Sequence, residues 1–423
     1  MTIQEFSAHL PSARQLAQNL LGSLQRATRD PAGGVTRPSY GEGEQVAHTL
    51  VAEQACAMGL EVTTDAALNT YMTLPGTDRS LPGVVIGSHL DSVARGGNYD
   101  GAAGVVAGLA AIHLLQEIGI SPAFDITVMG VRAEESAWFR HSYIGSKAAL
   151  GLLEPAALDA RRIDTQKTLA EHITELGGNP GALASGHAFL RSARIRAYVE
   201  VHIEQAPSLV QRKHPLAIGT AIPGNVRYPN ITVSGTTAHV GLPHRFRNDA
   251  LKAAAEFVSE MEALWRAWET QGKPMAFTVG RFHTDIDNDA TTKVPGIACF
   301  SVDMRAYDEN DVRTLDQIAK QIAGNLEKRH GVRFDFGERT TAPVAKTDTA
   351  MSDAFTRLAA KAGIPAEPLP SPASHDAAVF AGAGIPIGLI LIRNEHGSHN
   401  PDEHMDLDDL MAGINVLTRW LAE

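Results

Sequence analysis

The chain has 423 residues, of which 44% are hydrophobic and 20% are charged, so it has enough length for two domains with buried cores and is not a disordered chain. Its net charge of −11 and the absence of a lysine- or arginine-rich block exclude a nucleic-acid-binding or anionic-membrane-binding protein, which leaves small-molecule chemistry. The two cysteines fall outside any metal-binding spacing and the first residues lack the pattern of a secretory signal, so we expect a cytoplasmic protein.

Strands and helices alternate along the first half of the chain. Apolar residues recur at helical spacing over residues 44–58 and 101–118, whereas residues 83–88, 124–133 and 196–203 are short runs rich in β-branched residues. Such alternation predicts an α/β domain with a mixed, mostly parallel sheet.

The pattern changes near Ala221, where strands and helices follow in the order β-α-β-β-α-β. These elements are expected at 225–235, 247–272, 274–282, 296–307, 311–331 and 332–338. This order is typical of a ferredoxin-like α+β unit. Helix and strand alternate again over 351–393, so we predict a discontinuous catalytic domain, 1–213 and 336–423, interrupted by an inserted domain at 214–335.

Polar side chains gather where the predicted strands of the first domain end. His89 follows the first strand, Glu134 and Glu135 follow the second, His202 ends the third and His399 follows the strand at 385–393, with Asp100 at the start of the 101–118 helix. Ligands of open α/β sheets bind beyond the carboxyl ends of the strands, so these side chains are expected at one edge.

Imidazole nitrogens and carboxylate oxygens together are ligands for zinc, manganese and related divalent ions, and one shared aspartate is typical of a two-metal hydrolytic site. One of the two adjacent glutamates would bind metal while the other moves a proton. Asp91, two residues after His89, would orient the imidazole of His89 through its second nitrogen. Glycines around this segment would let the backbone approach the ions closely.

The stretches GSHLDSV with GGNYDGAAGV, RAEES, EVHIEQAP and GSHNPDE occur in that order, and GGVTRPSY precedes them. In these motifs the chain resembles the M20-type metallopeptidase-fold amidohydrolases of the hydantoinase/carbamoylase family, which include N-carbamoyl-L-amino acid hydrolase, β-ureidopropionase and allantoate amidohydrolase. The resemblance implies a catalytic domain with two divalent metal ions per subunit, an inserted lid and dimerisation domain, and hydrolysis of a ureido C–N bond.

Carried over by position, the resemblance assigns roles to individual residues. The metal ligands would be His89, Asp100, Glu135, His202 and His399, with Asp100 bridging. The resemblance makes Glu134 the general base and places His239 in the lid, from which it would reach the active site of a neighbouring subunit. It further makes Arg305 the ligand of the substrate carboxylate and puts Gln205 and His375 in the substrate pocket.

Three positions depart from the family pattern. Ala206 stands where the family usually has glycine, the loop after His239 is one residue shorter with His244 in place of methionine, and Thr292 replaces a substrate-binding asparagine. The sequence thus predicts a homodimeric N-carbamoyl-L-amino acid amidohydrolase acting on a small ureido acid, with allantoate hydrolysis as the alternative. A dipeptidase or aminoacylase of the same fold is the least favoured alternative. Peptidases of this fold tend to carry an acidic residue at the position where this chain has His202.

Overall fold

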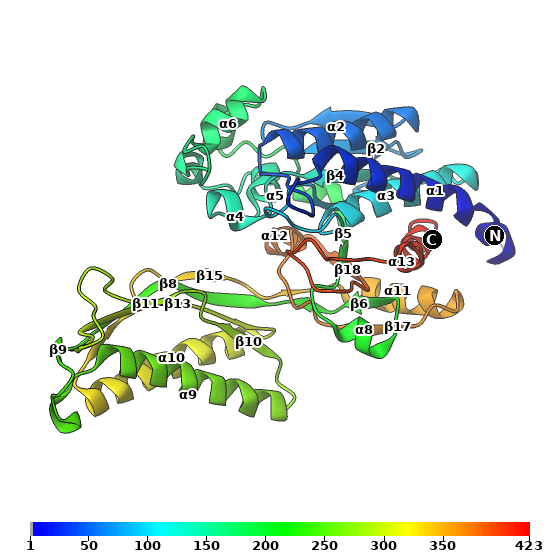
Figure 1. The fold of residues 1–423 in the computed structure, drawn as a ribbon. Coiled ribbons are helices and arrows are strands. Elements are labelled where there is room, and N and C mark those ends of the chain that lie inside the picture. The colour runs from blue at the N-terminus through cyan, green and yellow to red at the C-terminus, as the bar shows by residue number, and fades with distance from the viewer. Residues whose placement is uncertain (1–2) are drawn as a thin grey trace. The chain divides into compact units, whose positions relative to one another are not determined.

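The computed structural model describes residues 3–423, which divide into two units. Unit 1 contains the residues up to Ile222 together with Lys346–Glu423, and unit 2 is Pro223–Ala345. Both boundaries lie later in the chain than the sequence predicts, because β6 (Leu216–Gly219) joins the sheet of unit 1 and β15 (Thr340–Ala342) joins that of unit 2. Figure 1 traces the chain through both units.

Unit 1 is built on an eight-stranded mixed sheet in the order β1-β2-β4-β3-β5-β18-β6-β17. Strands β4, β3, β5 and β18 run parallel at its centre, while β1, β2 and the β18–β6 pair add antiparallel pairings. The bounds are β1 (Glu61–Thr64), β2 (Thr70–Leu74), β3 (Gly83–His89), β4 (Ile126–Val131), β5 (Ile195–Ile203), β17 (Ala366–Leu369) and β18 (Ile387–Ile392). The central strands are continuous apolar runs because helices cover the sheet.

Helix α3 (Ala102–Glu117) is the most buried helix of unit 1, since α1 (Ile3–Thr28), α2 (Glu42–Ala57) and α13 (Leu407–Leu421) pack around it over the sheet (Figure 1). Helix α11 (Thr349–Lys361) packs beside α13. The remaining short elements are α4 (Ser136–Phe139), α5 (Ile144–Ala149), η1 (Pro155–Asp159), α6 (Leu169–Glu175), α7 (Pro180–Ala184), η2 (Ser192–Arg194), α8 (Ser208–Arg212) and α12 (Ala377–Gly382). The two-residue strands β7 (Ala221–Ile222) and β16 (Ala345–Lys346) pair with each other.

Unit 2 has the predicted β-α-β-β-α-β order and an antiparallel sheet in the order β10-β13-β8-β14, which is the ferredoxin-like arrangement. Helices α9 and α10 cover one face of this sheet, and their apolar sides form a core with Phe257 and Phe300 (Figure 1). The bounds are β8 (Gly224–Ser234), β9 (Ala238–His239), η3 (His244–Phe246), α9 (Ala250–Thr270), β10 (Met275–Thr278), β11 (Phe282–Thr284), β12 (Lys293–Val294), β13 (Ile297–Ala306), α10 (Glu309–His330) and β14 (Arg333–Asp335).

The predicted strand at 274–282 is two strands, β10 and β11, both paired with β13. The ladder is interrupted between them because the Arg281 backbone N–H donates to the Ser301 hydroxyl instead of to a carbonyl of β13. Over the residues that the structure describes, no helix combines the length and the apolar composition that a membrane crossing requires.

Candidate metal centre

The chemistry-bearing residues of unit 1 come together at the carboxyl edge of its parallel strands, as the sequence predicts for this topology. His89 is the last residue of β3 and His202 lies one residue before the end of β5. Glu135 follows β4 and starts α4, whereas His399 lies in the loop after β18. Between the strands, Asp100 precedes α3 and is buried.

Asp100 lies at the centre of two groups of potential ligands. Its Oδ1 is 3.4 Å from Nε2 of His89 and 3.1 Å from Nε2 of His202. Its Oδ2 is 3.2 Å from Nε2 of His399, which lies 3.2 Å from Oε1 of Glu135. In each group the ligand atoms lie within 4.8 Å of one another. Such separations suit donors that each approach one ion to about 2.0–2.2 Å, and only Asp100 belongs to both of these groups. A third group of potential ligands, Glu200, His202 and His375, shares His202 with the first.

The hydrogen bonds of two imidazoles determine which nitrogen faces Asp100. Nδ1 of His89 lies 3.0 Å from the carbonyl oxygen of Asp91, and Nδ1 of His202 lies 3.0 Å from that of Ile203. A carbonyl only accepts, so Nδ1 carries the hydrogen in both rings and Nε2 is directed at Asp100. This is the tautomer that a metal-binding histidine requires, and the residues present therefore fit divalent ions.

The carboxylates and imidazoles of this cluster shift the pKa values of one another. Burial acts to raise the pKa of Asp100, but hydrogen bonds from His202, His399 and His89 hold that pKa well below its usual value. Hydrogen bonds with Asp100 and Glu135 raise the pKa of His399 to about 11.

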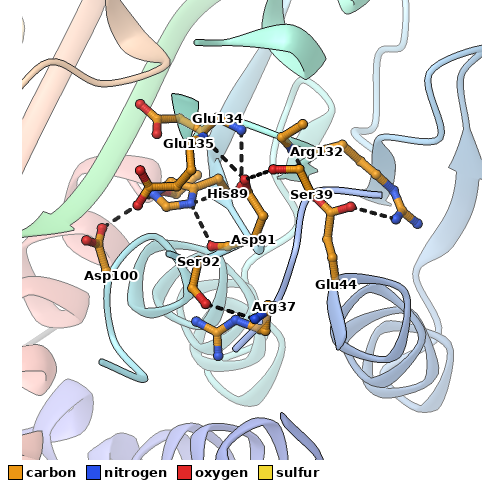
Figure 2. Close-up of polar contacts among 12 residues, drawn as sticks. Arg37, Ser39, Glu44, His89, Asp91, Ser92, Asp100, Arg132, Glu134 and Glu135 are labelled. Atoms are coloured by element: carbon orange, nitrogen blue, oxygen red, sulfur yellow. Dashed lines mark hydrogen bonds and ion pairs between the residues drawn. The ribbon is translucent and has the colours of Figure 1, made fainter. Parts of the chain in front are cut away.

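Asp91 connects His89 to the loop that carries the two glutamates (Figure 2). Its Oδ1 lies 3.3 Å from Nδ1 of His89 and accepts the backbone N–H of Glu134 at 3.1 Å. Its Oδ2 accepts the backbone N–H of Glu135 at 3.2 Å and the hydroxyl of Ser39 at 2.6 Å. The fully buried carboxylate thus orients one imidazole and fixes two successive residues of the 134–135 loop.

Glu134 belongs to none of the three groups of potential ligands among the described residues. Burial raises the pKa of its carboxyl well above the usual value, with the neighbouring carboxylates of Glu135 and Asp376 acting in the same direction and His89 opposing them. A carboxyl group with a raised pKa beside a metal centre is suited to accept and return a proton.

Close backbone approach explains one glycine of the first motif. Gly101 has φ of +67°, and a Cβ there would lie 2.5 Å from the His89 ring. The departure at Ala206 is accommodated, because Ala206 is not among the residues with positive φ.

Two residues of the GSHNPDE motif support Asp100, and the sequence interpretation did not assign them a role. Ser398 donates its hydroxyl to Oδ2 of Asp100 at 2.7 Å and also contacts Glu403. Glu403 accepts the backbone N–H groups of Tyr99 and Asp100 at 2.9 and 3.2 Å. Their presence in the same motif as His399 was the available signal, but their contacts span about 300 residues of sequence and no local pattern marks them.

Of the predicted substrate residues in unit 1, Gln205 lies beside the potential ligands, and His375 forms a group of them with Glu200 and His202. The side-chain amide of Gln205 donates to Oδ2 of Asp100 at 2.9 Å. The ring of His375 packs 4.3 Å from that of His202, centroid to centroid, and its Nε2 contacts the Ser371 hydroxyl at 2.7 Å. Burial lowers the pKa of His375 well below its usual value, so this ring is neutral.

The other predicted residues lie in unit 2. His239 is exposed on β9, opposite Lys293 of β12, and the carbonyl of the exposed Thr292 accepts the N–H of Val240 at 2.8 Å. Arg305 lies on β13 and donates two hydrogen bonds, of 3.1 and 3.0 Å, to Asp303. The register pairs Arg305 with Asn225 at the start of β8, whereas His239 follows the other end of that strand.

The chain is similar to known metal-dependent hydrolases along nearly its whole length. Residues 85–423 match the model of the peptidase family M20/M25/M40. An N-carbamoyl-L-amino acid amidohydrolase of Geobacillus stearothermophilus is 34% identical over 414 residues, 96% of this chain and 97% of its own. An allantoate amidohydrolase of Bacillus subtilis is 28% identical over 391 residues, 92% of both chains.

Among solved structures, a hydantoinase/carbamoylase family amidase from Burkholderia ambifaria superposes with a TM-score of 0.83 at 26% identity, covering 96% of each chain. The fold, the donor set and these relatives define a metal-dependent hydrolase that acts on amide C–N bonds. More narrowly, the chain belongs to the peptidase family M20/M25/M40.

Proposed function

We propose that this protein hydrolyses the ureido C–N bond of an N-carbamoyl-L-amino acid, or of a closely related ureido acid, with two divalent ions bound per subunit. The observation that carries the proposal is the carboxylate of Asp100, whose two oxygens face the two groups of potential ligands, as suits a bridging ligand. The relative from Geobacillus stearothermophilus supports the ureido substrate. Zinc or manganese, and alternatively cobalt or nickel, match a donor set of imidazoles and carboxylates.

The ions would supply Lewis-acid activation of a water molecule and of the substrate carbonyl. Glu134 would accept a proton from the attacking water and donate it to the leaving nitrogen, for which its position outside the ligand groups and its raised pKa are suited. One ureido acid and one water would give the amino acid, carbon dioxide and ammonia. Gln205, His375 and Thr292 are the proposed contacts to the rest of the substrate.

Arg305 is the proposed partner of the substrate carboxylate. A guanidinium group offers a planar set of donors that matches a carboxylate in a bidentate contact. The two hydrogen bonds to Asp303 fix the plane of this guanidinium before substrate binds.

His239 is the proposed donor that polarises the substrate carbonyl, and it would act in the site of a second subunit. Arg305 pairs with Asn225 near the start of β8. Strand β8 ends nine positions later, at Ser234, and His239 follows that end. At about 3.3 Å per residue this separation is about 30 Å, too long for both side chains of one subunit to contact one small substrate.

Exposed apolar side chains of unit 2 support a homodimer, which we propose as the working form in the cytoplasm. Ile286 is 75% exposed and Phe246 is 59% exposed. Phe282 and Ile297 are also exposed, on β11 and β13, and β11 lies at an edge of the sheet. Apolar side chains and an open strand edge are features that a second copy of the chain would cover.

Allantoate hydrolysis is the second candidate. It is favoured by the allantoate amidohydrolase relatives from Bacillus subtilis and Escherichia coli, at 28% and 29% identity. Allantoate is itself a ureido acid, so the same arrangement of residues would serve it.

The test is ammonia release from chelated enzyme restored with zinc or manganese. The panel contains N-carbamoyl L- and D-amino acids, N-carbamoyl-β-alanine, allantoate and dipeptides. Metal-dependent release from an N-carbamoyl-L-amino acid supports the proposal, and preferred release from allantoate selects the second candidate. If metal is bound and every ureido compound is inert, the proposal is wrong and acylated amino acids are the next substrates to assay.

A further inference from the structure

Three successive backbone N–H groups in the loop after β4 are all held by buried carboxylates from elsewhere in the chain (Figure 2). The N–H of Ala133 donates to Oε1 of Glu44 at 2.9 Å. The next two N–H groups, of Glu134 and Glu135, donate to the two oxygens of Asp91. Glu44 thus accepts the backbone N–H of Ala133 in the same way that Asp91 accepts those of the two glutamates.

Ala133 needs this restraint because its backbone is strained. Its φ is +51°, in the left-handed region that favours glycine. A side chain in this conformation is energetically unfavourable, so the surrounding contacts must hold it there. Ala133 directly precedes Glu134, so its conformation sets the position from which the Glu134 side chain extends.

Glu44 is itself rigidly placed. It is fully buried in the first turn of α2, and its Oε2 accepts the N–H of Tyr40 at 2.6 Å and Nη1 of Arg132 at 3.0 Å. The buried Arg132 also donates to the carbonyl of Leu68 and to the side chain of Gln45. Glu44 therefore fixes the loop through two successive residues, by the side chain of Arg132 and by the backbone of Ala133.

The structure assigns Glu44 the role of a positioning residue for Glu134: it holds Ala133 in the left-handed conformation and thereby aims the carboxyl that moves the proton. Glu44 belongs to none of the groups of potential ligands, and it is separated from the reacting atoms by the backbone it holds. The inference rests on the proposed role of Glu134. The rival interpretation is a buried ion pair with Arg132 that stabilises unit 1 and does not affect catalysis.

The test uses Glu44→Gln, which keeps the shape of the side chain but has only one acceptor oxygen. The N–H groups of Ala133, Tyr40 and Arg132 now donate to two oxygens. Glu42→Gln, an exposed change in the same turn of α2, is the matched control. We expect Glu44→Gln to lower kcat by about 10- to 100-fold with KM and metal content unchanged, as for residues that orient ligating or catalytic groups. Unchanged kcat, or loss of kcat together with metal, overturns the inference.

A second comparison separates positioning from simple stabilisation. Ala133→Gly removes the strain, so the loop needs less restraint and the loss caused by Glu44→Gln shrinks in that background. If the effect of Glu44→Gln on kcat is the same with and without Ala133→Gly, Glu44 does not act through the conformation of Ala133, which contradicts the inference.

Hydrogen exchange provides a readout that does not depend on the substrate. The amides of residues 133–135 exchange faster in Glu44→Gln than in Glu42→Gln if the contact restrains the loop, and equal exchange overturns the inference. If the wild-type protein hydrolyses no ureido compound, the proposed function fails, and the exchange result alone decides whether Glu44 restrains this loop.

Discussion

Glu134 and Glu135 are adjacent and chemically identical, yet their surroundings differ. Glu135 lies 3.2 Å from His399 within a group of potential ligands, whereas Glu134 belongs to none of the groups. The backbone N–H groups of both are fixed by Asp91. The left-handed Ala133 before them and the start of α4 after them direct the two side chains differently.

Replacing Glu134 by glutamine should therefore separate catalysis from metal binding. We expect Glu134→Gln to lose activity by at least about 10²- to 10⁴-fold, because the amide cannot accept the proton of the attacking water. Elemental analysis should find the same metal content as in the wild-type protein. Loss of metal in this variant would place Glu134 among the ligands instead.

Gly101 offers a second test at the level of single residues. An alanine at this position would combine a φ of +67° with a Cβ 2.5 Å from the ring of His89, so the imidazole would have to move. We expect Gly101→Ala to weaken zinc binding in a chelator-competition titration. Gly119→Ala is the matched control, since Gly119 has φ of +70° and a Cβ there would meet nothing within 4 Å. The control should lose about 1–2 kcal/mol of unfolding free energy and keep its metal affinity; equal affinities in both variants would contradict the expectation.

At the scale of elements, α2 contains a buried histidine that makes the stability of unit 1 depend on pH. His48 is 2% exposed, Nδ1 contacts the Thr70 hydroxyl at 2.8 Å, and Nε2 is a buried nitrogen without a partner among the described residues. Burial, and secondarily the charge of Arg132, lower the pKa of His48 well below its ordinary value of 6.5.

The sign of the effect follows from the unfolded state, in which His48 takes up a proton below about pH 6.5 while the folded protein does not. Unfolding is therefore favoured as the pH falls below that value, by up to about 1.4 kcal/mol per pH unit. Denaturation of wild type and His48→Gln between about pH 8 and pH 5 should show this extra slope only in the wild type. The exposed His187→Gln is the control and should behave as the wild type does.

Elements with a strong local pattern could be predicted from the sequence. Strands β3, β4, β5 and β18 are rich in apolar and β-branched residues, and α9 and α10 have clear helical periodicity, so their positions agree within a few residues. Strands β6 and β17 have only four residues each, too few for a pattern, and β6 is defined by its pairing with β18 and β17. The two domain boundaries lie later than predicted for the same reason, because short strands, β6 in unit 1 and β15 in unit 2, are assigned to a unit by their pairing.

The same distinction applies to the site. His89, Asp100, Glu135, His202 and His399 could be grouped from sequence because parallel strands bring their carboxyl ends to one edge. Glu44 could not, since it acts through a contact that joins distant segments and no motif contains it. Ser39 and Glu403 lie in the GGVTRPSY and GSHNPDE motifs, but the motifs do not predict their contacts, which also join distant segments.

At the scale of the whole molecule, the separation of His239 from the position of Arg305 along β8 predicts that activity depends on two subunits. His239→Ala and Glu134→Gln should each be inactive, and mixing them under conditions of subunit exchange should restore part of the activity, because one mixed site then contains both wild-type residues. The measurement is ammonia release after mixing, with separately incubated variants as the control. Absence of any recovery, with exchange verified by mass-labelled subunits, would place His239 in its own subunit's site or outside catalysis.

The central position of Asp100 has a consequence for how the protein takes up metal. With two ions bound as proposed, a carboxylate that faces both groups of potential ligands would transmit the arrival of one cation to the other group, because the first ion would draw charge from the oxygens that the second must share. Loading is then a linked equilibrium, and a titration with zinc or manganese should depart from the curve of two independent, identical sites. A preparation given half its full complement of metal would hold a distribution of empty, singly and doubly loaded molecules set by that linkage, and its activity would not be half that of the fully loaded enzyme.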